Sequence, residues 1–100
     1  MAFKIVWSEK ALIDLSQILN YWVERNKSDL YSLKLSEMIL NRVELLSKYP
    51  NLGKRTNAKE IRAHLVKDYF LFYKIKDKNL IIISVFDTRK DPKKIRRRIK

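Results

Sequence analysis

Apolar positions follow a two-residue period at the start of the chain and a helical period directly after it. Phe3, Ile5 and Trp7 lie on one side of a short extended segment, which predicts a first strand with an apolar face. Ser8 follows as a helix N-cap, because its hydroxyl can accept a hydrogen bond from a free backbone N–H of the first turn. Apolar residues then recur at i, i+3, i+4 and i+7, which predicts an amphipathic helix over residues 9–25.

A second helix is predicted over residues 29–49, where another apolar stripe runs along one side. Pro50 ends it, because the residue before a proline is pushed out of the α region. The short link between the two helices implies an antiparallel helical hairpin. Residues 50–59 then form a loop that contains the only glycine of the chain, Gly53.

Residues 60–89 predict three consecutive antiparallel strands, because their aromatic and β-branched runs suit a pleated and largely buried surface. Lys67-Asp68 makes the first turn and residues 76–79 make the second. The predicted order is therefore β-α-α-β-β-β. This is an α+β fold, in which the helical hairpin packs on one face of an antiparallel sheet.

The last two of these strands are apolar on both sides, so neither face is expected to be freely solvated. The helical hairpin covers only one face, and the other predicts a partner, since large apolar patches are rarely left bare. A partner segment that binds in a groove or adds a strand to an edge satisfies this, and so does a second copy of the chain. By alternation, one face is expected to carry Phe70, Phe72, Ile81, Ile83 and Val85, and the other Tyr69, Leu71, Tyr73, Ile75, Leu80 and Ile82.

The composition fits one small domain over residues 1–100, with a basic tail at residues 90–100. The chain has no cysteine and a single histidine, so we expect neither a disulfide nor a metal site, and no cofactor motif is present. No apolar run approaches the ~20 residues that a membrane helix needs, and no signal-peptide core is visible. We therefore expect a soluble cytoplasmic protein without a membrane partner.

Charge narrows the choice of partner. The chain has 23 basic and 11 acidic residues, a net charge of +12 and a pI near 10.1. Such a field attracts polyanions, namely nucleic acid, the ribosome or an acidic protein. The alternative is a surface that is charged only for solubility, although an excess this large in a small domain favours a polyanionic partner.

Five segments in this order resemble the RelE/ParE superfamily of bacterial toxins from type II toxin–antitoxin modules. They are Trp7-Ser8-Glu9-Lys10-Ala11, Tyr49-Pro50-Asn51-Leu52-Gly53, Ile61-Arg62 with Leu65, the run from Tyr69 to Ile75, and the run from Ile83 to Asp91. The resemblance implies a toxin that a cognate antitoxin holds inactive. It leaves two targets open, since RelE-like members cleave mRNA in the ribosomal A site and ParE-like members poison DNA gyrase. A third alternative, from the charge alone, is a non-toxic basic module that binds nucleic acid.

If the chain is a nuclease, the resemblance assigns catalysis to Arg62, His64 and Arg89. The position directly after Tyr69, where a RelE-like enzyme is expected to carry a catalytic arginine, is Phe70, and a phenyl ring cannot neutralise phosphate. This departure favours the ParE branch. The residues expected to bind nucleic acid or the target are Lys54, Arg55, Lys59, Arg62, Arg89 and Lys90.

Each of these residues also has a structural alternative. Either arginine can instead form an ion pair across the sheet, for instance with Asp87 or Asp68, and a lone histidine on a strand is more often a hydrogen-bonded structural residue. The basic loop residues and the tail can simply be solvated. Stacking of Tyr69 and Tyr73 on bases is the weaker reading, because their spacing favours packing in the core.

Overall fold

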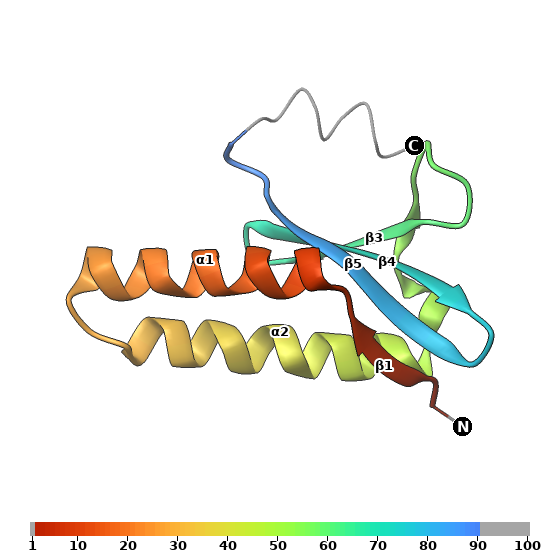
Figure 1. Ribbon diagram of the computed structural model, residues 1–100, viewed down its shortest axis with the longest axis horizontal. Helices are drawn as coiled ribbons and strands as arrows, with labels where there is room; N and C mark the ends of the chain where they lie inside the picture. The colour runs from red at the N-terminus through yellow and green to blue at the C-terminus, as the bar shows by residue number, and fades with distance from the viewer. Residues whose placement is uncertain (1, 91–100) are drawn as a thin grey trace.

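The computed structural model describes residues 2–90, so the predicted tail at residues 91–100 lies outside the described residues. Figure 1 shows the elements in chain order. They are β1 (Lys4–Trp7), α1 (Glu9–Asn26), α2 (Leu30–Lys48), a 3₁₀ helix η1 (Pro50–Leu52), β2 (Lys54–Arg55), β3 (Arg62–Val66), β4 (Tyr69–Lys76) and β5 (Asn79–Asp87).

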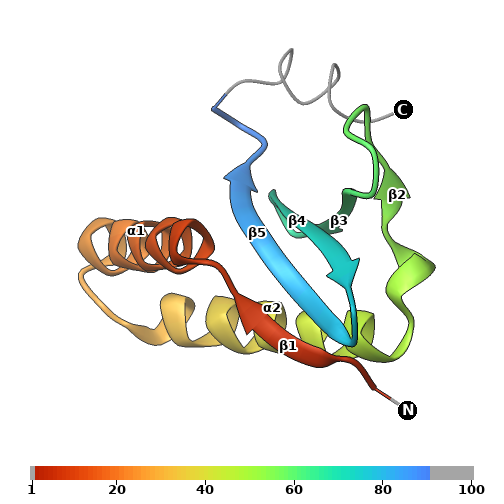
Figure 2. The same ribbon diagram turned by 45° about the vertical axis from the view of Figure 1, so that its right-hand side comes forward.

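The helical hairpin forms as predicted and is capped by local chemistry. The Ser8 hydroxyl accepts a hydrogen bond from Ala11 N at 3.0 Å and donates one to Ile83 O at 2.8 Å, so it fixes the start of α1 to β5. Between the helices, Ser32 Oγ donates to Leu19 O at 2.6 Å. Figure 1 shows the helices side by side and antiparallel, and Figure 2 shows that both cover the same side of the sheet. The α+β class and the hairpin on one face are thus confirmed.

The sheet is mixed, with the strand order β1-β5-β4-β3-β2. The strands β2 to β5 pair antiparallel, but β1 runs parallel to β5, with Ile5 opposite Leu80 and Trp7 opposite Ile82. The expectation of a purely antiparallel sheet is therefore wrong at this edge. Tight turns fix the direction of neighbouring strands, whereas β1 is joined to the others through the hairpin, which leaves its direction open. The two-residue strand β2 also lies within the segment predicted as a loop.

A β-bulge changes which side chains face the helices. Phe72 lies opposite Ser84 and Tyr73 opposite Ile82, so Ile83 is an extra residue on β5. Side chains after the bulge change faces, and Val85 therefore packs in the core beneath the helices. The predicted grouping of Val85 with Phe70 and Phe72 is wrong for this reason.

The main core lies between the hairpin and the sheet, and a smaller apolar cluster lies on the opposite face. The smaller cluster comprises Ala63 and Phe72 with the half-buried Ile61, Phe70 and Phe86 around them. Both faces of the sheet are therefore apolar, as predicted. The main core comprises Ala11, Leu35, Ile39, Val43, Leu46, Val66, Tyr69, Leu71, Tyr73, Leu80, Ile82 and Val85. Across residues 2–90, neither helix has the length and apolar character needed to cross a membrane.

Candidate functional site

Arg62, the first residue of β3, binds the segment that follows α2, at Gly53. Its Nη1 donates to Gly53 O at 2.7 Å. Gly53 N in turn donates to the Tyr73 hydroxyl at 2.9 Å, and that hydroxyl donates to Pro50 O at 2.5 Å. Burial raises the pKa of Tyr73, although the hydrogen bond from Gly53 and the charge of Arg62 oppose the rise. The Arg62 guanidinium therefore contributes to a partly buried hydrogen-bond network that positions residues 50–53.

His64 lies on the same face of β3 as Arg62 and meets α2. Its Nε2 is 3.1 Å from Arg42 Nη1, which can only donate, so Nε2 is the acceptor. Burial and, less strongly, the charge of Arg42 lower the pKa of His64 below 6.5. The imidazole is therefore neutral at pH 7, and the nitrogen that could act as a base already accepts a hydrogen bond.

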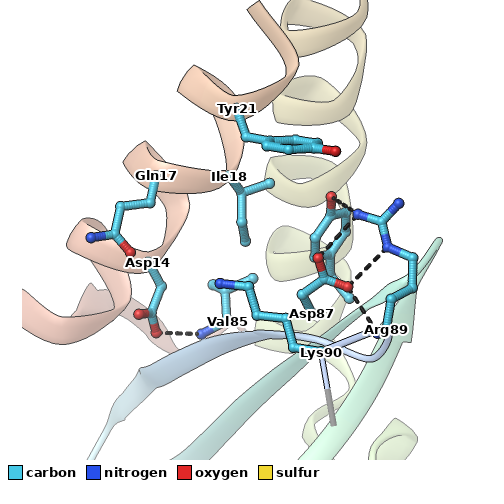
Figure 3. A pocket seen from close by; sticks show the side chains of 9 residues that line it. Asp14, Gln17, Ile18, Tyr21, Val85, Asp87, Arg89 and Lys90 are labelled. Carbon is cyan, nitrogen blue, oxygen red and sulfur yellow. Dashed lines mark hydrogen bonds and ion pairs between the residues drawn. The ribbon is translucent and has the colours of Figure 1, made fainter. Parts of the chain in front are cut away.

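Arg89 lies beyond β5 and is held by several groups at once (Figure 3). Its Nε donates to Asp87 Oδ1 and its Nη2 to Asp87 Oδ2, both at 3.0 Å, and its backbone N donates to Oδ1 at 2.9 Å. The Nη2 also lies 3.3 Å from the Tyr69 hydroxyl. The guanidinium carbon lies 5.3 Å from the centre of the Trp22 ring, within reach of a cation–π interaction. These contacts orient Arg89 before any ligand arrives.

In the ion pair between Arg89 and Asp87, the arginine is much more exposed than the aspartate. The side chain of Arg89 is 45% exposed and that of Asp87 is 14% exposed. Burial acts to raise the pKa of Asp87, but the hydrogen bonds and charge of Arg89, helped by Lys90, hold it below its ordinary value. The Asp87 hydrogen bond in turn raises the pKa of Arg89. The structural alternative for Arg89, an ion pair with Asp87, is thus present, while the outer edge of the guanidinium remains accessible.

A cavity of about 560 Å³ opens next to Arg89, between α1 and the end of β5 (Figure 3). Asp14 lies at one end of it. Its carboxylate accepts a hydrogen bond from Val85 N at 3.1 Å and forms an ion pair with Lys10 at 2.8 Å. The α1 residues of this cavity were missed by the sequence analysis. Their spacing is the signal that could have found them, since positions i, i+3, i+4 and i+7 of a helix share a face. The lining residues are Asp14, Gln17, Ile18, Tyr21, Tyr69, Val85, Asp87, Arg89 and Lys90.

The other predicted binding residues lie elsewhere, around the segment that leads into β3. A cavity of about 570 Å³ is lined by residues 55–62, including Arg55, Lys59 and Arg62. Lys54, on β2, is exposed nearby, opposite Ala63. An apolar cavity of about 410 Å³ adjoins this segment on the open face, against Phe72 and Ile83.

The structure does not gather the three candidate catalytic residues. Arg62 and His64 are close on β3, but Arg62 is opposite Tyr73 whereas Arg89 contacts Tyr69, four residues away along β4. At ~3.3 Å per residue, this separates the two contact points by about 13 Å. Phe70 lies on the open face and packs against Phe72, with ring centres 6.1 Å apart. Within residues 2–90, no three acidic or histidine side chains gather to hold a metal ion.

One family model matches most of the chain. The model of a family described as the ParE toxin of type II toxin-antitoxin system, parDE, matches residues 5–92. No curated protein matches the sequence significantly. A solved chain from the chromosomal ParDE TA system of P. aeruginosa superposes with a TM-score of 0.75 at 19% identity, over 86% of this chain and 96% of that chain. A chain of the E. coli DinJ-YafQ toxin-antitoxin complex gives a TM-score of 0.46 at 22% identity, over 89% of this chain and 96% of that chain.

Proposed function

We propose a function for this chain from its membership of the ParE toxin family of type II toxin–antitoxin systems. The protein inhibits growth in the cytoplasm, and its target is DNA gyrase. A cognate antitoxin neutralises it. In this proposal the protein acts by binding and has no chemistry of its own. The observation that carries the proposal is the environment of the residues that a nuclease would need.

Cleavage of RNA requires a base for the ribose 2′-hydroxyl and cations directed at the phosphate. Here the Nε2 of His64 is engaged by Arg42, and the charge of Arg89 is compensated by Asp87. Phe70 occupies the position where a third cation is expected, within a cluster of aromatic rings. This arrangement supports binding over catalysis.

We assign the contact with gyrase to the cavity beside Arg89. The arginine presents its exposed edge there, while Asp87, Tyr69 and Trp22 fix its orientation, so little conformational entropy is lost on binding. Lys90 adds a second cation, and Gln17 and Tyr21 supply polar groups from α1. Such a mixed polar and aromatic surface is typical of a protein contact.

We assign the antitoxin contact to the open face of the sheet. The smaller apolar cluster lies there, next to the apolar cavity at Phe72 and Ile83. Lys54 and Arg55 border this region on β2, so an antitoxin segment with acidic and apolar residues matches it in both charge and polarity.

Mechanism is tested by two assays on the same purified chain. In a supercoiling assay with plasmid DNA, we expect inhibition of gyrase and trapped gyrase–DNA cleavage complexes. Primer extension on a reporter mRNA in cell-free translation is expected to show no added cuts. Arg89→Ala should weaken gyrase inhibition at least tenfold, whereas Lys78→Ala, which removes one positive charge at the exposed turn between β4 and β5, should leave it within twofold.

Other outcomes point to the alternatives. Ribosome-dependent cuts that disappear in Arg62→Ala or His64→Ala would establish an mRNA nuclease, and the neutral His64 two residues from Arg62 is the feature that would then explain them. If the chain neither inhibits gyrase nor causes mRNA cuts, and its expression does not arrest growth, it is a binding module without toxicity. Restoration of growth by co-expression of the neighbouring open reading frame tests the antitoxin separately.

A further inference from the structure

Four exposed leucines lie on the two helices of the hairpin. Leu30 is 70% exposed, Leu33 60% and Leu40 50% on α2, and Leu12 is 52% exposed on α1. Single exposed leucines are ordinary on protein surfaces, so the question is whether these four are neighbours.

Helix geometry places them together. Leu30, Leu33 and Leu40 follow at spacings of three and seven residues, so they share one side of α2. The hydrogen bond from Ser32 Oγ to Leu19 O sets the register between the antiparallel helices. Leu12 lies seven residues before Leu19 on α1 and Leu40 lies eight residues after Ser32 on α2, so at ~1.5 Å per residue the two leucines are nearly level, about two turns from this hydrogen bond. We call Leu12, Leu30, Leu33 and Leu40 the hairpin leucines.

Charge is distributed unevenly between the hairpin and the rest of the chain. Residues 9–48 contain six basic and six acidic residues and are therefore neutral in sum. The described residues outside the hairpin, 2–8 and 49–90, contain eleven basic and four acidic residues and therefore carry a net charge of +7. A polyanion or an acidic partner is consequently drawn to the sheet and its loops, and not to the hairpin.

We propose that the hairpin leucines form a surface for self-association, on which a second copy of this chain binds through α2. When two copies meet through their neutral hairpins, the two basic sheets lie at opposite ends of the dimer. Their separation then exceeds the Debye length of ~8 Å at physiological ionic strength, so salt screens their repulsion. The other side of the molecule would bring like charges together. The proposal is independent of the target, because the Arg89 cavity and the open face lie outside this surface.

The spacing of the leucines also suits a two-fold axis. In an isologous interface the same patch of both copies meets, and two helices that cross such an axis side by side run antiparallel. With the axis between Leu33 and Leu40, Leu33 of each copy lies against Leu40 of the other. Leu12 then extends the apolar contact from α1.

The first measurement is the mass of the purified full-length chain by analytical ultracentrifugation, after nuclease treatment, from 1 to 100 µM. We expect a concentration-dependent shift from 12.1 kDa toward twice this mass. The double substitution Leu33→Asp and Leu40→Asp should weaken dimerisation at least tenfold. Leu52→Asp is the matched control, because Leu52 is also 50% exposed but lies on η1, and it should leave the dimer unchanged. Circular dichroism of each variant checks that it folds.

A crosslinking test does not depend on disruptive substitutions. The chain has no cysteine, so Leu33→Cys and Leu40→Cys each introduce a single thiol. On mild oxidation, a mixture of the two variants should form the mixed disulfide at least fivefold more than either symmetric one. A monomer throughout the concentration range, or equal yields of all disulfides, would overturn the proposal. A monomer whose Leu33→Asp and Leu40→Asp variant loses its antitoxin would also overturn it, and would assign the surface to the antitoxin.

Discussion

The backbone of Gly53 lies directly against the phenol ring of Tyr73, twenty residues away in the sequence. Gly53 N donates to the Tyr73 hydroxyl at 2.9 Å, and Gly53 O accepts from Arg62 Nη1 at 2.7 Å. A Cβ at position 53 would lie 2.7 Å from Tyr73 Cε1 and 2.9 Å from Cζ, and closer still to the phenol oxygen. The φ angle of Gly53 is −70°, so the glycine is required by this close approach and not by its backbone conformation.

Gly53→Ala should therefore lower the free energy of unfolding by about 1–3 kcal/mol, because the added methyl group overpacks a buried contact. Urea unfolding followed by circular dichroism measures this. Ala58→Gly is a control at an exposed position five residues further along, and it should change stability by less than about 1 kcal/mol. An alanine variant as stable as the wild type would show that Tyr73 moves away at little cost.

Asp87→Asn should lower the free energy of unfolding by about 1 kcal/mol at pH 7, a modest amount because its partner Arg89 is nearly half exposed. The pKa of Asp87 is lower in the folded protein, so its contribution is complete above the ordinary carboxyl pKa of ~3.9 and is lost as the pH falls through the folded value. Unfolding at pH 7, 5 and 3 should show the difference from wild type shrinking only at the lowest pH.

Asp77→Asn provides the control for that experiment. Asp77 is exposed at the turn between β4 and β5, with a φ of 58° that asparagine also tolerates. Its substitution should leave stability within about 0.5 kcal/mol at each pH. A gap between wild type and Asp87→Asn that persists at pH 3 would contradict the assignment of the ion pair.

His64 should titrate below 6.5 in an NMR experiment, and it is the only histidine, so its ring signals need no assignment by mutation. Arg42→Ala should raise this pKa without bringing it to the ordinary value, because burial is the larger cause. Lys34→Ala, an exposed cation on the same helix, should leave it unchanged. A titration above 6.5 would mean that His64 has an anionic neighbour.

Because the pKa of His64 is lowered in the folded protein, the free energy of unfolding depends on pH. The unfolded state takes up a proton more readily than the folded one, so stability is complete above ~6.5 and falls as the pH drops through the folded pKa. His64→Gln should remove this part of the pH dependence. The comparison of unfolding at pH 7.5 and 5 between the two proteins measures it.

Ser8→Ala should lower the free energy of unfolding by about 1 kcal/mol, since Ala11 N loses its cap acceptor. The loss of the donor to Ile83 O adds to this, because that carbonyl lies where β5 bulges. Ser16→Ala is the control, an exposed serine in the same helix whose hydroxyl bonds only to its own helix. Thermal unfolding of the three proteins should rank Ser8→Ala lowest.

The elements of this protein follow from residues that are close in the sequence. The N-cap at Ser8, the end of α2 before Pro50 and the turn at Lys67-Asp68 all depend on interactions within a few residues, and the structure contains them where the sequence predicts them. The family resemblance also lay in local segments. The α+β class could therefore be predicted from the sequence.

The candidate site could be predicted only in part. The sequence supplied Arg89, Lys90 and the basic segment near β2, but not Trp22, Tyr69 and Asp14 as their neighbours. These residues come from α1 and β4, and only the packing of the hairpin on the sheet brings them to Arg89.

The same division explains two of the corrections to the fold, the direction of β1 and the face of Val85. A sequence determines helices, turns and apolar faces because capping, helical period and chain reversal act over a few residues. The direction of β1 depends on which sheet edge is free when the hairpin returns, and the bulge at Ile83 depends on how β4 and β5 pack under the helices. Both features depend on contacts between residues that are far apart in the chain, so only the tertiary structure determines them.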